Sequence, residues 1–149
     1  KALIVALSSA SSSATLPVSI NCLEVNAKVK KRVAGFVTPL GATLNMDGTA
    51  LYQSLLIIFL AKATGMDVSF SQQILIFVFI MFSSAGTAGI PGGGIVMMGV
   101  TLEAIGLPLE LLGIYLLVDR FWDYPITALN VWGDLVGAKV VDQRVSSKS

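Results

Sequence analysis

The chain has 149 residues, of which 54% are hydrophobic and 13% are charged, and its mean hydropathy is +0.80. Soluble domains carry roughly 25% charged residues, so a membrane protein is favoured over a Leu-rich soluble helical domain. One cysteine and no histidine exclude a disulfide framework and a Cys/His metal cluster. A net charge of +1 gives no reason to expect nucleic acid as a partner.

Apolar runs alternate with polar or glycine-rich breaks along the chain. The first run starts directly after Lys1, so we expect the chain to be a piece of a longer protein. Residues 1–25 contain a serine-rich break with short apolar arms on both sides. This pattern predicts most of a re-entrant helical hairpin, which enters the membrane and returns to the same side. Residues 33–64 predict a membrane-spanning helix that is interrupted at residues 45–47.

The second half of the chain repeats this organisation. Residues 70–106 predict a second re-entrant hairpin, residues 109–141 the last spanning helix, and residues 142–149 a cytoplasmic tail. The same unit therefore occurs twice, a hairpin followed by a spanning helix with Asn and Asp, and we expect an all-α membrane protein. Inverted repeats of discontinuous helices around a solute site near the midplane are typical of secondary transporters.

Basic residues gather in two places, between the first hairpin and the first spanning helix and after the last helix. They are Lys28, Lys30, Lys31 and Arg32 in the first place and Lys139, Arg144 and Lys148 in the second. If both places face the cytoplasm, every loop obeys the positive-inside rule. We therefore expect a multi-pass protein of the plasma membrane, which is the cell inner membrane if the source is bacterial.

Five polar side chains recur at spacings of three and four in the last helix, so a helix places them on one face. They are Arg120, Asp123, Thr127, Asn130 and Asp134. Ionisable groups at membrane depth are costly and indicate a functional site. An Arg120–Asp123 pair could be purely structural, but it leaves Asn130 and Asp134 without a role.

Asn45 and Asp47 lie in the break of the first spanning helix. Freed backbone carbonyls in such a break join side-chain oxygens to form an all-oxygen site, which suits Na⁺. Asp47 and Asp134 could keep their charge beside the ion, whereas a proton on each would indicate H⁺ coupling instead. A serine nucleophile has no histidine base here, so we expect neither an enzyme nor an organic cofactor.

The two hairpin tips offer groups that could bind an anion. The tip at residues 86–94 lacks the lysine and the spacing of a phosphate-binding loop. Its glycines would expose backbone N–H groups to a carboxylate and allow the tip to move as a gate. Ser11, Ser12 and Ser13 at the other tip offer hydroxyls and amides for the same purpose.

Four motifs together resemble the dicarboxylate/amino acid:cation symporter family, which includes glutamate transporter homologues and neutral amino acid exchangers. They are SSSATLP at residues 11–17, NMDGTALYQ at 45–53, GTAGIPGGG at 86–94 and a D…T..N…D helix at 123–134. The likeness covers nearly the whole chain. It implies the C-terminal part of a mobile transport domain, which works with the rest of its own chain, in a homotrimer whose scaffold domain is absent here.

The resemblance implies three sodium sites. The first would use the carbonyls of Gly41 and Asn130 and the carboxylate of Asp134, beside Asn45. The second would use the backbone oxygens of Thr43, Met46, Ser84, Ala85 and Thr87. The third would use Asn45 and Asp47 with partners from a helix outside this chain.

The resemblance also implies a site for a small amino acid. The substrate α-carboxylate would meet the serine tip, the side chain of Asn130 and the second tip. The amides of the second tip are those near Ile90, Pro91, Gly92, Gly93 and Gly94. The amino group would meet Asp123 and Thr127, and Thr49 would line the pocket.

One departure from the family bears on the substrate side chain. Members that take glutamate or aspartate have an arginine where this chain has Ile126, and a further arginine where it has Ala10 or Tyr124. An acidic side chain is costly to desolvate without a cation, so sodium-coupled symport of a neutral amino acid is favoured. Arg120 lies about 10 Å up the helix from Thr127 and could be the counter-charge for an acidic substrate. Obligate exchange and a channel-like or structural role also stay open.

Overall fold

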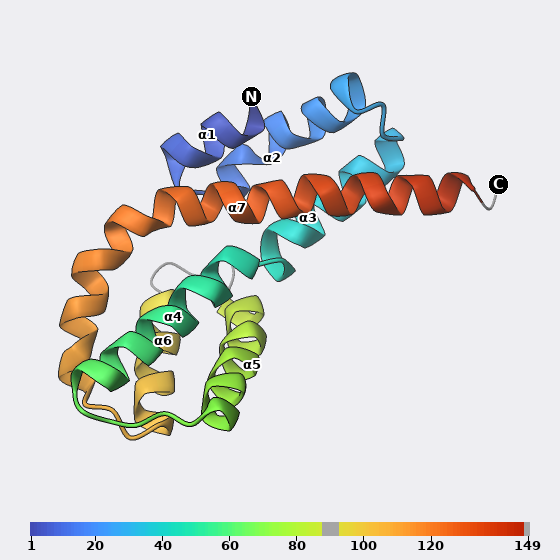
Figure 1. The fold of residues 1–149 in the computed structure, drawn as a ribbon. Coiled ribbons are helices and arrows are strands. Elements are labelled where there is room, and N and C mark those ends of the chain that lie inside the picture. Colours follow the sequence, from blue (N-terminus) through green and yellow to red (C-terminus); the bar gives the residue numbers. More distant parts are fainter. Residues whose placement is uncertain (88–92, 148–149) are drawn as a thin grey trace.

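The computed structural model describes residues 1–87 and 93–147, and this part of the chain is helical without a strand. The all-α expectation is therefore confirmed for these residues. In chain order the elements are α1 (Ala2–Ser9), α2 (Ser12–Asn21), the π-helical turn η1 (Cys22–Asn26), α3 (Lys31–Leu44), α4 (Asp47–Ala63), α5 (Phe70–Thr87), α6 (Gly93–Ala104), the 3₁₀ turn η2 (Leu109–Leu111) and α7 (Leu112–Ser146) (Figure 1).

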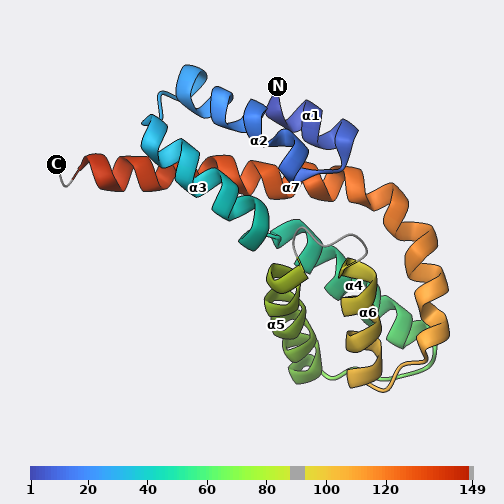
Figure 2. The same cartoon turned by 180° about the vertical axis from the view of Figure 1, so that it is seen from behind.

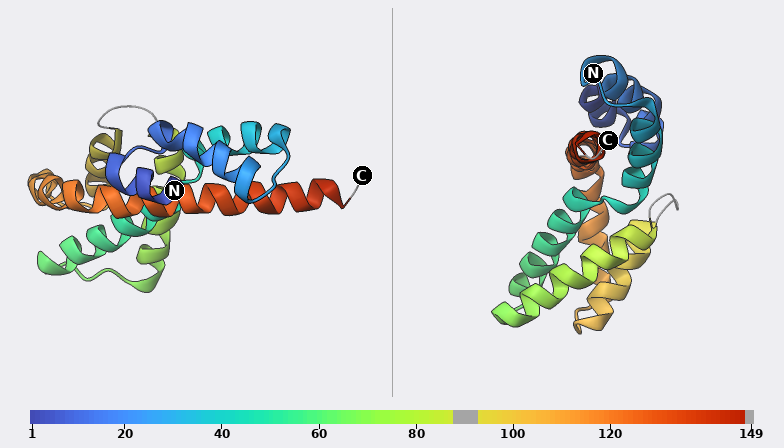
Figure 3. Two further views of the ribbon diagram at one scale, coloured as in Figure 1. Left: turned by 90° about the horizontal axis from the view of Figure 1, so that it is seen from above. Right: turned by 90° about the vertical axis from the view of Figure 1, so that its right-hand side faces the viewer.

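Two groups of helices lie on either side of the break between α3 and α4. Helices α1, α2 and α3 pack along the C-terminal half of α7, as the views from behind and from above also show (Figures 2 and 3). Helix α4 contacts α7 on both sides of its bend, through Gly48 at Asn130 and through Gln53 at Tyr115, and α6 also contacts α7. Helix α5 packs against α4 and α6. Pro125 lies inside α7, where it removes a backbone hydrogen bond and crowds the preceding turn, which explains the bend.

The first two helices form a tight antiparallel pair. Ala10 ends α1 in the left-handed backbone region with φ of 49°, and the Ser11 hydroxyl caps α2 by accepting a hydrogen bond of 3.1 Å from the amide of Ala14. A serine before a helix commonly satisfies one of its free N–H groups in this way. The serine-rich segment at the expected tip therefore makes the turn. Whether the pair enters the membrane as a re-entrant hairpin stays a prediction.

The break between α3 and α4 covers Asn45 and Met46. The Asn45 amide still donates to the carbonyl of Gly41 at 2.7 Å, and α4 begins when the Ala50 amide donates to the carbonyl of Met46 at 2.8 Å. Helices α3 and α4 together cover Lys31–Ala63. In the described part of the chain, this is the one helical segment that is long and apolar enough to cross a membrane. The membrane-spanning role of α7 stays a prediction.

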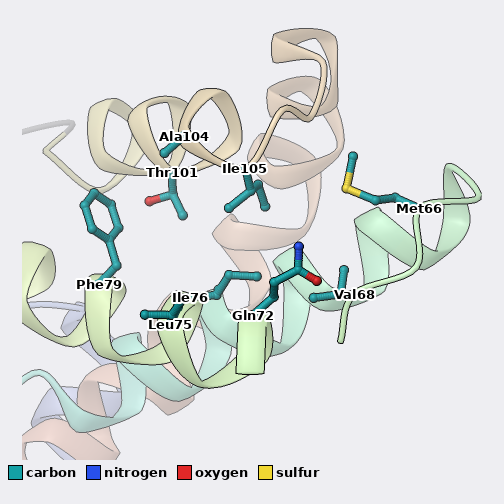
Figure 4. Close-up of a pocket in the computed structure, with 9 residues that line it drawn as sticks. All are labelled: Met66, Val68, Gln72, Leu75, Ile76, Phe79, Thr101, Ala104 and Ile105. Atoms are coloured by element: carbon teal, nitrogen blue, oxygen red, sulfur yellow. The ribbon is translucent and has the colours of Figure 1, made fainter. Parts of the chain in front are cut away.

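Helices α4, α5 and α6 share an apolar core. Ile57, Leu60, Ile80, Met98 and Leu102 are buried in it. Near the start of α5 and the end of α6, these helices and the connection from α4 line a cavity of about 410 Å³ (Figure 4). Its lining is mostly apolar: Met66, Val68, Gln72, Leu75, Ile76, Phe79, Thr101, Ala104 and Ile105.

The last helix continues beyond residue 141, and two of its side chains make long-range hydrogen bonds. Residues 142–146, which the sequence analysis assigned to a tail, continue α7. The buried carboxylate of Asp142 accepts a hydrogen bond of 3.1 Å from the amide of Lys30, and the ammonium of Lys139 donates to the carbonyl of Ala27 at 2.8 Å. These two bonds fasten the connection between η1 and α3 to α7.

Candidate functional site

The break between α3 and α4 packs directly against the polar stripe of α7. The side-chain oxygen of Asn130 accepts a hydrogen bond of 2.8 Å from the amide of Gly48, in the first turn of α4. The Asn130 Nδ2 donates to the hydroxyl of Thr49 at 3.1 Å and contacts the sulfur of Met46 at 3.4 Å. Asn130 is 3% exposed. Its side chain satisfies the amide of Gly48, one of the N–H groups that the start of α4 leaves without a partner inside the helix.

Asp134 lies one turn further along α7, at the same break. Its side chain is 4% exposed, and its Oδ1 accepts a hydrogen bond of 3.0 Å from Nδ2 of Asn45. The same Nδ2 lies 3.4 Å from the carbonyl oxygen of Asn130. A side chain on Gly41 would collide with the Asp134 carboxylate, so that carboxylate lies directly against α3. The Asp134 carboxylate and the Asn130 carbonyl, both expected to bind sodium, therefore lie at the same Nδ2 atom of Asn45.

A cavity of about 510 Å³ opens beside this cluster. Both aspartates of the expected sodium sites line it: Asp134 is buried, whereas Asp47 is exposed in the first turn of α4. In the described ranges, no three His, Cys, Asp or Glu side chains group as metal ligands. A cation here would therefore depend on backbone carbonyls and amide oxygens as well as carboxylates, a ligand set that suits Na⁺.

The residues expected to form the second sodium site come from α3, the break and the end of α5. Helices α3 and α5 contact each other, and Ser84 is buried. The Thr43 hydroxyl donates to the carbonyl of Leu40 at 2.9 Å. Ala85 and Thr87 belong to the last turn of α5. A shared sodium ion among these backbone oxygens stays a prediction.

The structure brings part of the expected substrate site together. Thr49 and Asn130 are hydrogen-bonded, Thr127 is buried one turn earlier on α7, and the Asp123 carboxylate interacts with the Thr127 side chain. Of the second tip, Gly93 and Gly94 begin α6, and Ile90, Pro91 and Gly92 lie outside the described residues.

The serine tip joins this region through helix packing. Apolar side chains of α1 and α2 pack against α7 on both sides of Asn130, in a cluster that includes Ala6, Val18, Ala128 and Val131. Ser11 is engaged in capping α2, and Ser12 and Ser13 follow it in the first turn of that helix. Contact of these serines with a substrate stays a prediction.

Comparison with known proteins identifies the family of this chain. The model of the sodium:dicarboxylate symporter family matches residues 1–144. The chain belongs to this family. The earlier resemblance is therefore confirmed, and the family is one of transporters rather than enzymes.

Curated members of the symporter family align with nearly the whole chain. Excitatory amino acid transporter 1 of Ambystoma tigrinum is 48% identical over 142 residues, which are 95% of this chain and 26% of that protein. The human protein of the same name is 47% identical over 142 residues, with the same coverage. An excitatory amino acid transporter of Caenorhabditis elegans is 45% identical over 141 residues, or 95% of this chain and 28% of that protein. The chain thus spans about a quarter of the length of these relatives.

Sequence reasoning missed a second polar cluster in this symporter family chain. Gln53 and Tyr115 are both buried, and Nε2 of Gln53 donates to the Tyr115 hydroxyl at 3.3 Å. The Tyr115 hydroxyl also interacts with the carboxylate of Asp119, one turn later on α7. Asp119 lies one turn before Asp123, so extending the polar stripe toward the start of α7 could have found it.

Close packing at the break predicts the effect of a small substitution in α7. A methyl group on Gly133 would lie 2.5 Å from Nδ2 of Asn45. Gly133→Ala should therefore destabilise the full-length protein by about 1–3 kcal/mol, the usual cost of overpacking. Thermal unfolding in detergent measures this change.

Gly137→Ala on the same helix is the matched control, because nothing lies within 4 Å of its added methyl group. It should leave stability unchanged or raise it by up to about 1 kcal/mol through helix propensity. Equal melting temperatures for the two variants would contradict the close approach of Asn45 to α7.

Proposed function

We propose that this chain forms the ion-binding and solute-binding core of a sodium-coupled amino acid symporter that works by alternating access. One observation carries the proposal: the carboxylate of Asp134 and the carbonyl of Asn130 both lie at the side-chain Nδ2 of Asn45, in the break of a long apolar helix. Buried oxygens at a helix break are the arrangement in which transporters hold Na⁺. Membership of a sodium symporter family agrees with this use.

In this proposal the first sodium site uses the carbonyls of Gly41 and Asn130 with the carboxylate of Asp134. The rim of the same cavity supplies Asp47 for the third site, together with Asn45 and groups outside this chain. A cation at either place would neutralise a carboxylate that is otherwise costly to keep charged at membrane depth. The ion supplies charge compensation, and the chain's own residues fix the positions of its oxygens.

The substrate would bind where Asn130, Thr49 and Thr127 lie together, with Asp123 taking its amino group. Asn130 connects the two sites, because its side chain faces Thr49 and its carbonyl faces Asn45. A change in the position of Asn130 therefore affects ion and substrate together. This shared residue gives a physical basis for coupling, since the binding of one ligand orders a group that the other also needs.

For the substrate side chain, we propose an uncharged group. Residue 126 is an isoleucine, half-buried, whose carbonyl faces Gly48 at the break. Residue 124 is a tyrosine, so neither position supplies a cation to a second carboxylate. A bidentate arginine is hard to replace in such a role.

An acidic amino acid is the second candidate, and the relatives favour it. The relatives named above are called excitatory amino acid transporters, and the matching family model is that of sodium:dicarboxylate symporters. Arg120 would have to supply the positive charge. It lies on α7 close enough to Asp123 for their charges to interact, and its side chain is exposed.

The proposal includes a place in the cell and an assembly. We propose two re-entrant hairpins, α1–α2 and α5–α6, and spanning helices formed by α3–α4 and α7, in a multi-pass protein of the plasma membrane. The exposed basic residues before α3 would then face the cytoplasm. Trimer formation would depend on a scaffold domain outside this chain.

Uptake of amino acid by the full-length protein in vesicles should require a Na⁺ gradient. Asp134→Asn should abolish most of this uptake, because it removes the charge that the ion neutralises. Radiolabelled uptake with Na⁺ replaced by choline measures the dependence. Uptake driven by a pH gradient in choline would overturn sodium coupling in favour of protons, and uptake only into vesicles preloaded with substrate would identify an exchanger.

A methyl group beside Asp134 should weaken sodium binding specifically. Gly41→Ala places that group against the carboxylate, and we expect it to raise the Na⁺ concentration for half-maximal effect by about ten-fold or more, a loss of roughly 1.4 kcal/mol. Gly35→Ala, also on α3, has nothing within 4 Å and should bind Na⁺ as the unmodified protein does. A thermal-shift titration with NaCl measures both.

An arginine at position 126 should change substrate preference. Ile126→Arg supplies a cation beside Thr127, so binding of aspartate or glutamate should become at least about ten-fold tighter, while binding of neutral amino acids weakens. A thermal-shift screen of all amino acids with Na⁺ measures the preference. Micromolar aspartate binding by the unmodified protein, abolished by Arg120→Ala, would establish the acidic candidate instead.

A further inference from the structure

The connection between η1 and α3 is held in place on both sides of Lys28. The amide of Val29 donates to the carbonyl of Leu23 at 2.9 Å, and the Val29 side chain is buried in the core that it shares with Leu23. Side chains of α7 bond to the carbonyl of Ala27 and to the amide of Lys30. The connection lies beside the C-terminal half of α7 (Figures 1 and 2), and its backbone has a fixed course.

Lys28 has a backbone conformation that suits glycine better than lysine. Its φ is 54°, in the left-handed region, where a Cβ atom is crowded and glycine carries no such penalty. The Lys28 side chain is exposed, so burial in a core does not compensate for this cost. A residue held in a disfavoured conformation points to a use for its side chain.

The start of α3 also has cations where a helix disfavours them. Lys30 precedes the helix and makes no side-chain cap, although Ser, Thr, Asp or Asn is preferred at that position. Lys31 and Arg32 follow in the first turn, which contains no acidic residue. Positive charge at this end of a helix opposes the helix macrodipole. Local stability therefore favours capping or acidic residues here, and the chain has three exposed cations instead.

These placements give the connection a basic segment with a surplus of positive charge. Four exposed cations form this basic segment: Lys28, Lys30, Lys31 and Arg32. The sequence has no Asp or Glu between Glu24 and Asp47. On the α7 side, one ammonium and one carboxylate, those of Lys139 and Asp142, bond to the connection and offset each other in charge. The basic segment therefore favours an anionic partner.

The proposed membrane orientation decides which anion the basic segment meets. Residues 33–44 of α3 rise about 18 Å at 1.5 Å per residue. Half of a bilayer's hydrocarbon core is about 15 Å thick. With the break after residue 44 near the midplane, the start of α3 lies at the cytoplasmic membrane surface, where anionic lipids give a negative potential.

We propose that the basic segment binds the headgroup of an anionic phospholipid in the cytoplasmic leaflet, such as phosphatidylserine. This inference rests on the proposed function, because it uses the membrane orientation given there. The lipid phosphate neutralises cations that the left-handed turn and the start of α3 otherwise hold at a cost in stability. Because the backbone is already fixed, little ordering is needed when the lipid binds.

Native mass spectrometry of the full-length protein in a neutral detergent tests the site. The protein is titrated separately with phosphatidylserine and with phosphatidylcholine, and the bound lipid molecules are counted. Phosphatidylserine should bind more tightly, because phosphatidylcholine carries no net charge. Lys28→Gly and Arg32→Gln should each weaken phosphatidylserine binding by about five-fold, the usual effect of one cation near an anionic membrane surface.

The melting temperature separates this role from a structural one. Lys28→Gly should raise the melting temperature measured without added lipid, because glycine adopts the left-handed conformation without strain. Arg32→Gln should also raise it, because it removes a charge that opposes the helix macrodipole. A variant that is more stable and binds the lipid less tightly has lost a binding group rather than its fold.

Lys62→Gln is the matched control. Lys62 is an exposed lysine in the last turn of α4, where a cation suits the helix. It lies at the other end of the broken helix from the basic segment, at the opposite membrane surface in the proposed orientation. Its loss should leave phosphatidylserine binding unchanged and should not raise the melting temperature.

Two results would overturn the proposal. The first is phosphatidylserine binding that is equal in the unmodified protein, Lys28→Gly and Arg32→Gln, which would make the basic segment a merely solvated surface. The second is inorganic phosphate or poly-glutamate that displaces the lipid at equal concentration, which would indicate a soluble anion or an acidic protein instead. Lipid binding is measured without substrate or a Na⁺ gradient, so a failure of the proposed symport is recognised separately in the uptake experiment.

Discussion

The structure depends on the pairing of a broken helix with the polar face of α7. Breaking a helix frees backbone N–H and C=O groups, and in an apolar surrounding each of these costs several kcal/mol unless it finds a partner. The Asn130 side chain accepts from the amide of Gly48 across the interface, and the Asn45 side chain donates to the Asn130 carbonyl and to the Asp134 carboxylate, which lies against α3 at Gly41. The break is therefore stable because of α7, and the polar side chains of α7 are stable because of the break.

This mutual dependence explains why the site has its composition. Its groups are mostly neutral amides and carbonyls, with one buried carboxylate at the break. Side chains of this kind satisfy backbone groups and also bind a hard cation, so one set of residues can serve both the fold and the chemistry. The small residues at positions 41, 48 and 133 serve the same end, because each lets the two helices approach at a polar contact.

Local patterns in the sequence predicted the parts of this arrangement that depend on local physics. A polar interruption in an apolar run indicated the break at residues 45–47, and the spacing of three and four along α7 indicated the face that carries Thr127, Asn130 and Asp134. The bend of α7 was not foreseen, because Pro125 tells that a helix is disturbed but not which neighbours receive its two halves. The polar contact between Gln53 and Tyr115 joins residues 62 positions apart, and no periodicity reports such a pair. The hydrogen bond between Asp142 and the amide of Lys30 likewise joins residues 112 positions apart.

The bonds from Lys139 and Asp142 to the connection after η1 distinguish the α1–α2 pair from the α5–α6 pair. They hold the chain that leaves the first pair against the terminal helix, where α1, α2 and α3 also pack on the C-terminal half of α7. After α6, the amide of Leu107 bonds instead to the carbonyl of Leu102 in the helix that it leaves. The chain leaving the first pair is thus anchored by side chains of a distant helix, whereas the chain leaving the second is anchored by a backbone bond to its own helix.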